Sequence, residues 1–186
     1  ESSTLVVYCG NLQTYQGVDL LIEGMKEALE SGADVDAVIA GGEEDQIQAY
    51  RAKAEALGIA DRIHLIGCWP AAKLGELLIE ADILTAPRTK GVNTPQKVFP
   101  YLHTGRAVLV TDLPTHSQIL SQDVCRLAPA DAAGFGRAIA ELAGDEALRR
   151  KLGTAGRLFA EKEHTYPAHK RRVAELYTKV AEVIGQ

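Results

Sequence analysis

Hydrophobic positions along this chain alternate between short continuous runs and longer stripes at helical spacing. The first run, Leu5 to Cys9, ends at Gly10, and a helical stripe follows from Val18 to Leu29. A short apolar run is typical of a buried strand, and a stripe of this kind is typical of an amphipathic helix. The same pair recurs, with strands predicted at 37–40, 63–66, 83–86, 107–111 and 124–128, and helices at 47–57, 74–81, 95–104 and 115–120.

This alternation predicts the fold class. Strands that alternate with helices form right-handed βαβ units, in which the strands lie parallel and the helices cover the sheet. After Pro129 the pattern changes to helices alone, with a break at Tyr166-Pro167 before a last helix. We therefore expect an α/β, Rossmann-like parallel sheet of six strands with helices on both faces and additional C-terminal helices. A single domain should cover residues 1–186.

Composition narrows the class of protein. The 186 residues are 46% hydrophobic, which suits one domain with a sizeable core. The formal net charge of -5 argues against a nucleic-acid-binding protein, whose surface is normally basic. No stretch is long and apolar enough to span a bilayer, and we expect no signal peptide before the first strand. The cysteines Cys9, Cys68 and Cys125 lie far apart in or beside apolar runs, which favours reduced core thiols of a cytoplasmic protein.

A polar, basic loop between the predicted strands 83–86 and 107–111 is the first candidate binding site. Thr94 is a suitable N-cap for a helix whose first residue is Pro95. A helix start directs free N–H groups and partial positive charge at the preceding loop, where Arg88, Lys90 and Lys97 add cations. Such a site suits an anion, most naturally a phosphate. The alternative interpretation is a capped surface helix with solvated basic side chains.

Other loops follow the carboxyl ends of the predicted strands, where open parallel sheets bind their ligands. Gly10-Asn11-Leu12 follows the first strand, and its glycine either lets a phosphate approach the backbone or simply forms a turn. The absence of a G-x-G-x-x-G pattern argues against a dinucleotide cofactor. The histidines His103, His116, His164 and His169 lack the spacing of metal ligands, so we expect no metal site.

Short motifs follow one another along nearly the whole chain. They are Tyr8 to Leu12 leading to Tyr15 to Ile22, Val38 to Gly42, Leu57 to Ile59 with Asp61 to Ile63 and Gly67, Ala81 to Leu84 with Pro87, Asn93 to Lys97, Tyr101-Leu102, Gly105 to Val108, and Thr111 to His116. In the order and spacing of these motifs the chain resembles the carboxy-terminal half of group 1 (family 4) glycosyltransferases, which have two Rossmann-like domains (GT-B type).

The resemblance implies a function. In that family this half binds a nucleotide-diphosphate-sugar donor, while the amino-terminal half binds the acceptor. The chain would then be the donor-binding domain of a retaining hexosyltransferase that acts on a glycan, lipid or small molecule, without a cofactor and without activity on its own. The start Glu1-Ser2-Ser3, which lacks an initiator Met, likewise leads us to expect a fragment of a longer protein. The alternative is a non-catalytic Rossmann-like module for ligand sensing or partner docking.

The resemblance also implies site residues, position by position. The diphosphate is expected at the loop around Gly10 and at Asn93-Thr94, with base and ribose toward Gly67-Cys68-Trp69 and the helix from Pro95 to Thr104. Trp69 is then either a stacking platform or a loop aromatic folded onto the core. The expected donor-binding residues are Gly10, Asn11, Gln16, Gly42, Trp69, Arg88, Lys90, Asn93, Thr94 and Lys97, and no catalytic residue is assigned.

The sequence departs from the family pattern at charged positions. Asn11 and Gln16 stand where the family commonly has two cations that neutralise the diphosphate. Val92 and Pro100 stand where it often has two glutamates, one near the sugar and one on the ribose hydroxyls. A further glutamate of the family is Gln118 here. These missing charges are the main argument for the non-catalytic alternative.

The last predicted helix, about 167–184, combines an apolar face with basic residues. We expect this helix to dock on the missing amino-terminal domain. The basic segment 170–172 and Lys179 also suit a peripheral contact with the inner membrane surface. Glu175 and Glu182 dilute the charge, however, and favour a solvated helix face.

Overall fold

The chain folds around one parallel sheet. The computed structural model describes residues 3–184, so the first two and last two positions of the expected domain lie outside the described residues. Six strands pair in the order β3-β2-β1-β4-β5-β6, which confirms the predicted α/β, Rossmann-like class. The strands are β1 (Thr4–Cys9), β2 (Val35–Ala40), β3 (Ile63–Gly67), β4 (Ile83–Ala86), β5 (Ala107–Thr111) and β6 (Arg126–Ala128).

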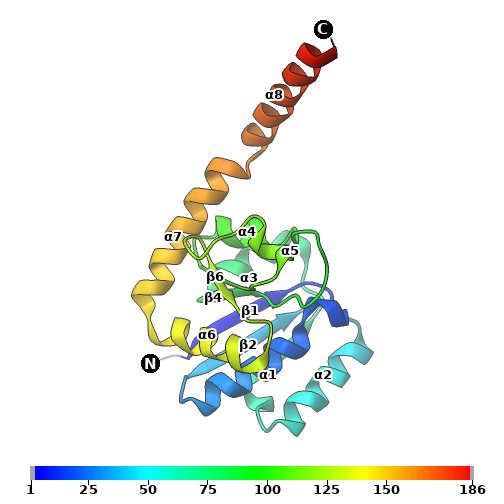
Figure 1. Ribbon diagram of the computed structural model, residues 1–186. Coiled ribbons are helices and arrows are strands. Elements are labelled where there is room, and N and C mark those ends of the chain that lie inside the picture. Colours follow the sequence, from blue (N-terminus) through cyan, green and yellow to red (C-terminus); the bar gives the residue numbers. More distant parts are fainter. Residues whose placement is uncertain (1–2, 185–186) are drawn as a thin grey trace.

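Helices cover both faces of the sheet (Figure 1). Helices α1, α2 and α6 pack on one face, α3 and α4 pack on the other, and α7 runs from the first layer to the second. The helices are α1 (Val18–Glu30), α2 (Glu44–Ala56), α3 (Leu74–Glu80), α4 (Val98–His103), α5 (Pro114–Ser117), α6 (Ala132–Gly144), α7 (Glu146–Glu163) and α8 (Tyr166–Ile184), with 3-10 turns η1 (Thr14–Gln16), η2 (Ala60–Arg62) and η3 (Ala71–Lys73).

The sheet divides the core into two layers. Along β1, Val6 and Tyr8 join the cluster under α1, α2 and α6, whereas Val7 joins the cluster under α3 and α4. Successive side chains of a strand point to opposite faces, so a central strand must be apolar throughout. This explains why the strands appear in the sequence as continuous hydrophobic runs.

The chain reverses its direction of travel across the sheet between β1 and β4. From β1 it moves outward to β2 and β3, then returns to β4 and continues to β5 and β6 on the other side. Pairing between β1 and β4 is confined to Val6 and Val7. Beyond that point the backbone of Cys9 bonds instead to the Tyr101 hydroxyl of α4, which accepts from Cys9 N and donates to Cys9 O at 3.0 Å each. The strands thus separate at their carboxyl ends, where such sheets bind ligands.

Several boundaries differ from the expected ones. The last strand is limited to Arg126–Ala128, and Tyr166-Pro167 opens α8 instead of preceding it, because proline suits the first turn of a helix. Cys125 is buried as expected, but Cys68 is exposed, so the interpretation of all three cysteines as core residues was wrong for Cys68.

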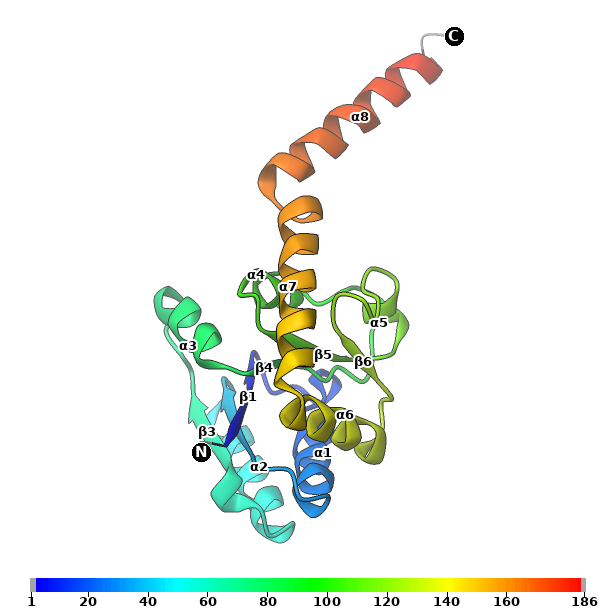
Figure 2. The same cartoon turned by 90° about the vertical axis from the view of Figure 1, so that its left-hand side faces the viewer.

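The last helix leaves the body of the domain. Helix α8 extends beyond the end of α7 and lies away from the sheet and its covering helices in both views (Figures 1 and 2). Large apolar side chains along it face solvent, including Leu176 at 60% and Tyr177 at 71% exposure. At the junction with α7, the His164 ring packs against Phe99 of α4, with ring centroids 4.3 Å apart.

Candidate functional site

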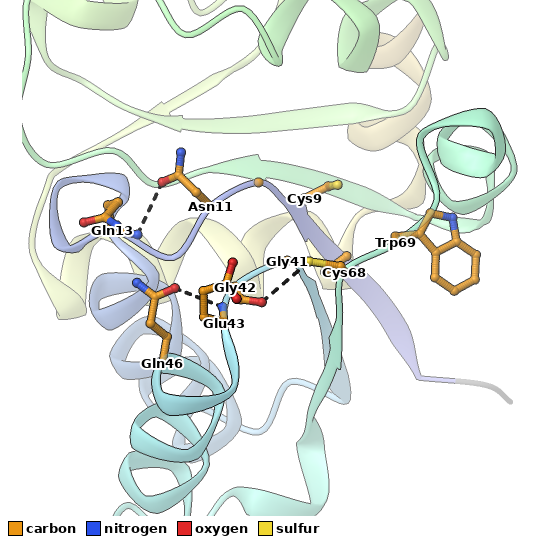
Figure 3. Close-up of a pocket in the computed structure, with 11 residues that line it drawn as sticks. Cys9, Asn11, Gln13, Gly41, Gly42, Glu43, Gln46, Cys68 and Trp69 are labelled. Atoms are coloured by element: carbon orange, nitrogen blue, oxygen red, sulfur yellow. Dashed lines mark hydrogen bonds between the residues drawn. The ribbon is translucent and has the colours of Figure 1, made fainter.

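A cavity of about 360 Å³ opens at the carboxyl ends of β1, β2 and β3. The loop after β1 contributes Asn11 and Gln13, and the start of α2 contributes Glu43 and Gln46 (Figure 3). These polar groups are linked in pairs: Gln13 N donates to Asn11 Oδ1 at 3.3 Å, and Glu43 N donates to Gln46 Oε1 at 3.1 Å. Cys9, Gly10, Ala40, Gly41, Gly42, Cys68 and Trp69 complete the lining.

Two glycines allow the backbone segments at this edge to approach one another. A Cβ atom on Gly41 would lie 1.9 Å from Gly10 O, so a side chain there would separate the loops after β1 and β2. Both residues also have positive φ, +155° at Gly10 and +122° at Gly41, which L side chains rarely adopt. The floor of the cavity is therefore bare backbone, which a ligand can approach closely.

The ammonium group of Lys97 lies directly behind Gly10. A Cβ atom on Gly10 would be 2.3 Å from Lys97 Nζ, so the lysine occupies the space that the glycine leaves open. Nζ is buried and has no hydrogen-bond partner within residues 3–184, and it lies 4.0 Å from the centroid of the Tyr8 ring. Burial lowers the pKa of this ammonium to about 8. A buried cation without a counter-charge is costly, which indicates a site for an anion.

Arg88 organises the loop after β4. Its Nη1 donates to Asn93 O at 2.9 Å, and its guanidinium lies 5.1 Å from the centroid of the Tyr15 ring. Thr115 Oγ1 donates to the same carbonyl of Asn93 at 2.7 Å. Arg88 Nε is buried and finds no partner in the described part of the chain. The arginine thus holds the loop closed and keeps one N–H available.

His116 is a buried histidine beside these two cations. Its Nδ1 lies 3.0 Å from Thr111 O, and since a carbonyl only accepts, Nδ1 carries the proton. Burial lowers the pKa of the imidazole to about 4, with Arg88 and Lys97 acting in the same direction. His116 is therefore neutral at pH 7. Its Nε2 then presents a lone pair that meets no donor among residues 3–184.

The predicted helix start at Thr94-Pro95 was wrong. Helix α4 begins at Val98, and the preceding residues form a turn in which Val98 N donates to Pro95 O at 3.2 Å. Thr94 Oγ1 does not cap the helix but accepts from Gln118 Nε2 at 3.0 Å. A side chain from another loop therefore uses the oxygen that the local pattern assigned to capping.

Half of the expected residues lie together at this edge of the sheet. Gly10, Asn11, Gly42 and Trp69 line the cavity together, and Lys97 lies behind it, which brings half of the predicted set to one place. The Trp69 indole lies at the outer end, apart from the other labelled side chains, and is 38% exposed while its Nε1 donates to Lys73 O. It is therefore not folded onto the core.

Six expected residues do not line this cavity: Gln16, Arg88, Lys90, Asn93, Thr94 and Lys97. Gln16 closes turn η1 and is buried, with 9% of its surface exposed, so it packs inside the loop. Lys90 is exposed on the loop after β4.

Sequence reasoning missed several residues that the structure brings to this edge. Gln13, Glu43 and Gln46 line the cavity, and Tyr8 and His116 contact or approach its cations. Gln13 and Glu43 lie in the loops after β1 and β2, a position from which they could have been predicted, whereas Gln46 lies in the first turn of α2. Tyr8 carries no such signal, because an aromatic residue in an apolar run is expected in the core.

Within residues 3–184, no group of three or more His, Cys, Asp or Glu side chains is arranged to hold a metal ion. In the same range, no helix is both long and apolar enough to cross a membrane.

A sequence model of the family described as glycosyl transferases group 1 matches residues 3–145. The chain therefore belongs to this family, as the resemblance in its motifs implied. YtcC of Bacillus subtilis, a provisionally assigned glycosyltransferase, is 22% identical over 188 residues, which is 97% of this chain and 46% of YtcC.

Solved structures share the fold. Alr3699/HepE of Anabaena, crystallised with UDP, superposes with a TM-score of 0.85 at 15% identity, over 96% of this chain and 49% of that one. The C-terminal domain of LpcC, a group 1 glycosyl transferase of Francisella tularensis, superposes with a TM-score of 0.78 at 17% identity, over 89% and 88% of the two chains. Our chain thus has the fold of such a C-terminal domain and spans about half the length of YtcC and HepE.

Proposed function

We propose that this chain is the nucleotide-diphosphate-sugar donor-binding domain of a retaining glycosyltransferase that transfers a hexosyl group to a glycan, lipid or small-molecule acceptor. The single observation that carries the proposal is the buried, unpartnered ammonium of Lys97 beside Gly10. Family membership and the UDP bound to the Anabaena protein support it. The diphosphate is the natural counter-charge, because the departing nucleotide carries negative charge that fixed cations and dipoles stabilise.

We infer that Lys97 supplies the positive charge that Asn11 and Gln16 do not. The family commonly neutralises the diphosphate from positions that are Asn11 and Gln16 here. Asn11 follows Gly10 directly, and Gln16 packs inside the same loop. Lys97 brings its charge to Gly10 from the turn before α4, so a cation stands at the same loop although it comes from elsewhere in the chain.

The cavity suits the remainder of the donor. Its volume of about 360 Å³ is within the range of small-ligand sites. The amides of Asn11 and Gln13 and the carboxylate of Glu43 supply donors and acceptors for hydroxyl groups and a base edge. Trp69 at the outer end of the cavity offers an aromatic face on which a base could stack.

Calorimetric titration tests the proposal. We expect UDP or another single nucleoside diphosphate to bind in preference to the rest, and Lys97→Met to weaken that binding. A charge-assisted hydrogen bond contributes about 1.5 to 3 kcal/mol, so the loss should be about one to two orders of magnitude. Lys151→Met on the exposed side of α7 is the matched control and should change nothing.

Two results would contradict the proposal. Failure of every nucleoside diphosphate to bind at millimolar concentration would favour the non-catalytic module for ligand sensing or docking. Unchanged affinity in Lys97→Met would remove the lysine from the phosphate site, even if a nucleotide binds.

We further propose that α8 docks on a second, acceptor-binding domain of the complete protein. Its exposed apolar side chains, among them Leu176, Tyr177 and Val183, have no covering surface within residues 3–184. Amide exchange should therefore be fast after Glu163 in this chain and slow in the complete protein. Slow exchange through Tyr177 in the isolated chain would contradict this.

A further inference from the structure

Tyr8 contacts both parts of the candidate phosphate site. It lies near the end of β1 and is completely buried. Its hydroxyl donates to Asn11 O at 2.6 Å, which ties down the loop after β1. The centroid of its ring lies 4.0 Å from Lys97 Nζ. One side chain therefore connects the backbone loop and the cation, which are far apart in the sequence.

The contact between Lys97 and Tyr8 is made across Gly10. Lys97 precedes α4 on one face of the sheet, whereas the Tyr8 side chain belongs to the core of the opposite face. The lysine reaches the ring past the carboxyl end of β1, through the space that a Cβ atom on Gly10 would fill. The bond between Tyr101 and Cys9 holds α4 against the same strand end, four residues after Lys97.

The Tyr8 ring is the partner that the ammonium has in place of a hydrogen-bond acceptor. The face of an aromatic ring is negative, and its attraction for a cation increases where water is excluded. A carboxylate in this position would neutralise the lysine and compete with an incoming anion. A ring holds the cation in place while leaving its N–H groups available.

We propose that Tyr8 is a positioning residue of the phosphate site, which fixes the Lys97 ammonium beside Gly10 before a diphosphate arrives. This inference rests on the proposed function. A cation that is already in place needs no reordering when the ligand binds, so its full attraction contributes to affinity. Tyr8 does not line the cavity, so in this arrangement it acts only through Lys97 and the Asn11 loop.

Calorimetry with UDP on a set of variants tests the role of the ring. Tyr8→Leu removes the aromatic face and should weaken UDP binding about tenfold. Tyr8→Phe retains the face and loses the bond to Asn11 O, and its affinity should stay within about threefold of wild type. In a Lys97→Met background, Tyr8→Leu should lower UDP affinity by less than about twofold, because the cation that Tyr8 positions is gone.

Three outcomes would overturn the proposal. They are unchanged affinity in folded Tyr8→Leu, an equal loss in Tyr8→Phe and Tyr8→Leu, and an equal loss with and without Lys97. The last two are what a purely structural role of Tyr8 predicts.

A measurement on the ligand-free protein separates this inference from the proposed function. In the wild type, the protons next to Lys97 Nζ should show an upfield NMR shift from the ring below, retained in Tyr8→Phe and lost in Tyr8→Leu. Absence of that shift in the wild type overturns the inference, even if Tyr8→Leu does not fold. If the shift is present but the protein binds no nucleoside diphosphate, the contact between Tyr8 and Lys97 is supported and the proposed donor site is contradicted.

Discussion

The carboxyl edge of the sheet and helix α8 leave opposite kinds of groups without partners. At the edge, buried polar atoms of Arg88, Lys97 and His116 lack hydrogen bonds within residues 3–184. On α8, apolar side chains such as Leu176 and Ile184 lie exposed to solvent. A buried polar atom without a bond and an apolar surface in water are both unfavourable, but different partners relieve them. A small polar ligand would relieve the first, and an apolar protein surface would relieve the second.

The two regions also differ in how firmly the domain holds them. The edge is fixed by the Tyr101 bonds to Cys9 and by glycines that allow close backbone contact. Helix α8 joins the body near His164, and Arg172 of its second turn pairs with Glu163 of α7. Binding at the edge should therefore be intrinsic to this chain, whereas the role proposed for α8 would require a second domain.

The largest effect expected concerns catalysis. This chain alone should bind a nucleotide sugar but transfer none of it, because transfer requires donor and acceptor to be oriented together in one cleft. Measurement of sugar transfer from UDP-glucose to candidate acceptors, with free UDP followed in parallel, checks this. Turnover onto an acceptor by the isolated chain would show that the two regions are not separate in function.

A smaller but still large effect is expected at Gly10. In Gly10→Ala the new methyl group would lie 2.3 Å from Lys97 Nζ and force the ammonium to move, so UDP affinity should fall about a hundredfold. Gly75→Ala in α3 is the matched control, because beyond its chain neighbours and its own helix backbone no atom of the described residues lies within 4 Å of its Cβ position, and it should leave affinity unchanged. Equal affinities of the two variants would separate Gly10 from the site.

The pH dependence of UDP binding should follow the ionisation of Lys97. Because the pKa of the Lys97 ammonium is lowered to about 8, the free protein loses this charge as the pH rises through that value. UDP affinity should then fall about tenfold between pH 7 and pH 9 in the wild type, relative to Lys97→Met. A constant ratio of the two affinities over that range would contradict the assignment.

The stability of the ligand-free protein should rise with pH over the range in which UDP affinity falls. The pKa of Lys97 is lower in the folded state than in the unfolded state. Above pH 8 the unfolded chain therefore binds more protons than the folded one. The cost of burying the charge is present in full below pH 8 and is relieved as the pH rises. The unfolding free energy of the wild type, relative to Lys97→Met, should therefore increase from pH 8 toward pH 10.

The smallest effect on binding is expected from α8. Replacing Leu176 and Val183 together by serine removes exposed apolar surface and should change UDP affinity by less than about twofold and stability by less than about 0.5 kcal/mol. The same variant should bind the second domain less tightly. Calorimetry and thermal unfolding check the first part, and a marked loss of UDP affinity would link the two regions.

Periodicity was sufficient to predict the sheet and its covering helices. Every predicted strand is present because buried central strands require continuous apolar runs, and that requirement is local. The start of α4 was not predictable in this way. Asn93-Thr94-Pro95 has the composition of a helix start. The side-chain amide of Gln118, which follows α5, instead donates a hydrogen bond to the Thr94 hydroxyl, and a contact between residues this far apart in the sequence is not contained in any local pattern.

The candidate site was predictable only in part, for a similar reason. Gly10, Asn11 and Gly42 could be found because they follow strand ends, which the topology brings to one edge. The pairing of Lys97 with Gly10 and Tyr8 connects residues distant in the sequence and on different faces of the sheet. Only the three-dimensional arrangement shows that the Lys97 ammonium lies beside the loop after β1.

Because α8 is long, a small rotation at its junction with α7 produces a large displacement at its far end. With 19 residues the helix spans about 28 Å, so a rotation of about 10° at the junction moves its far end by about 5 Å. The His164 ring at that junction packs on Phe99 of α4, the helix that follows Lys97. A small tilt of α4 would therefore be magnified along α8, and a domain held at its tip would travel several ångströms relative to the sheet.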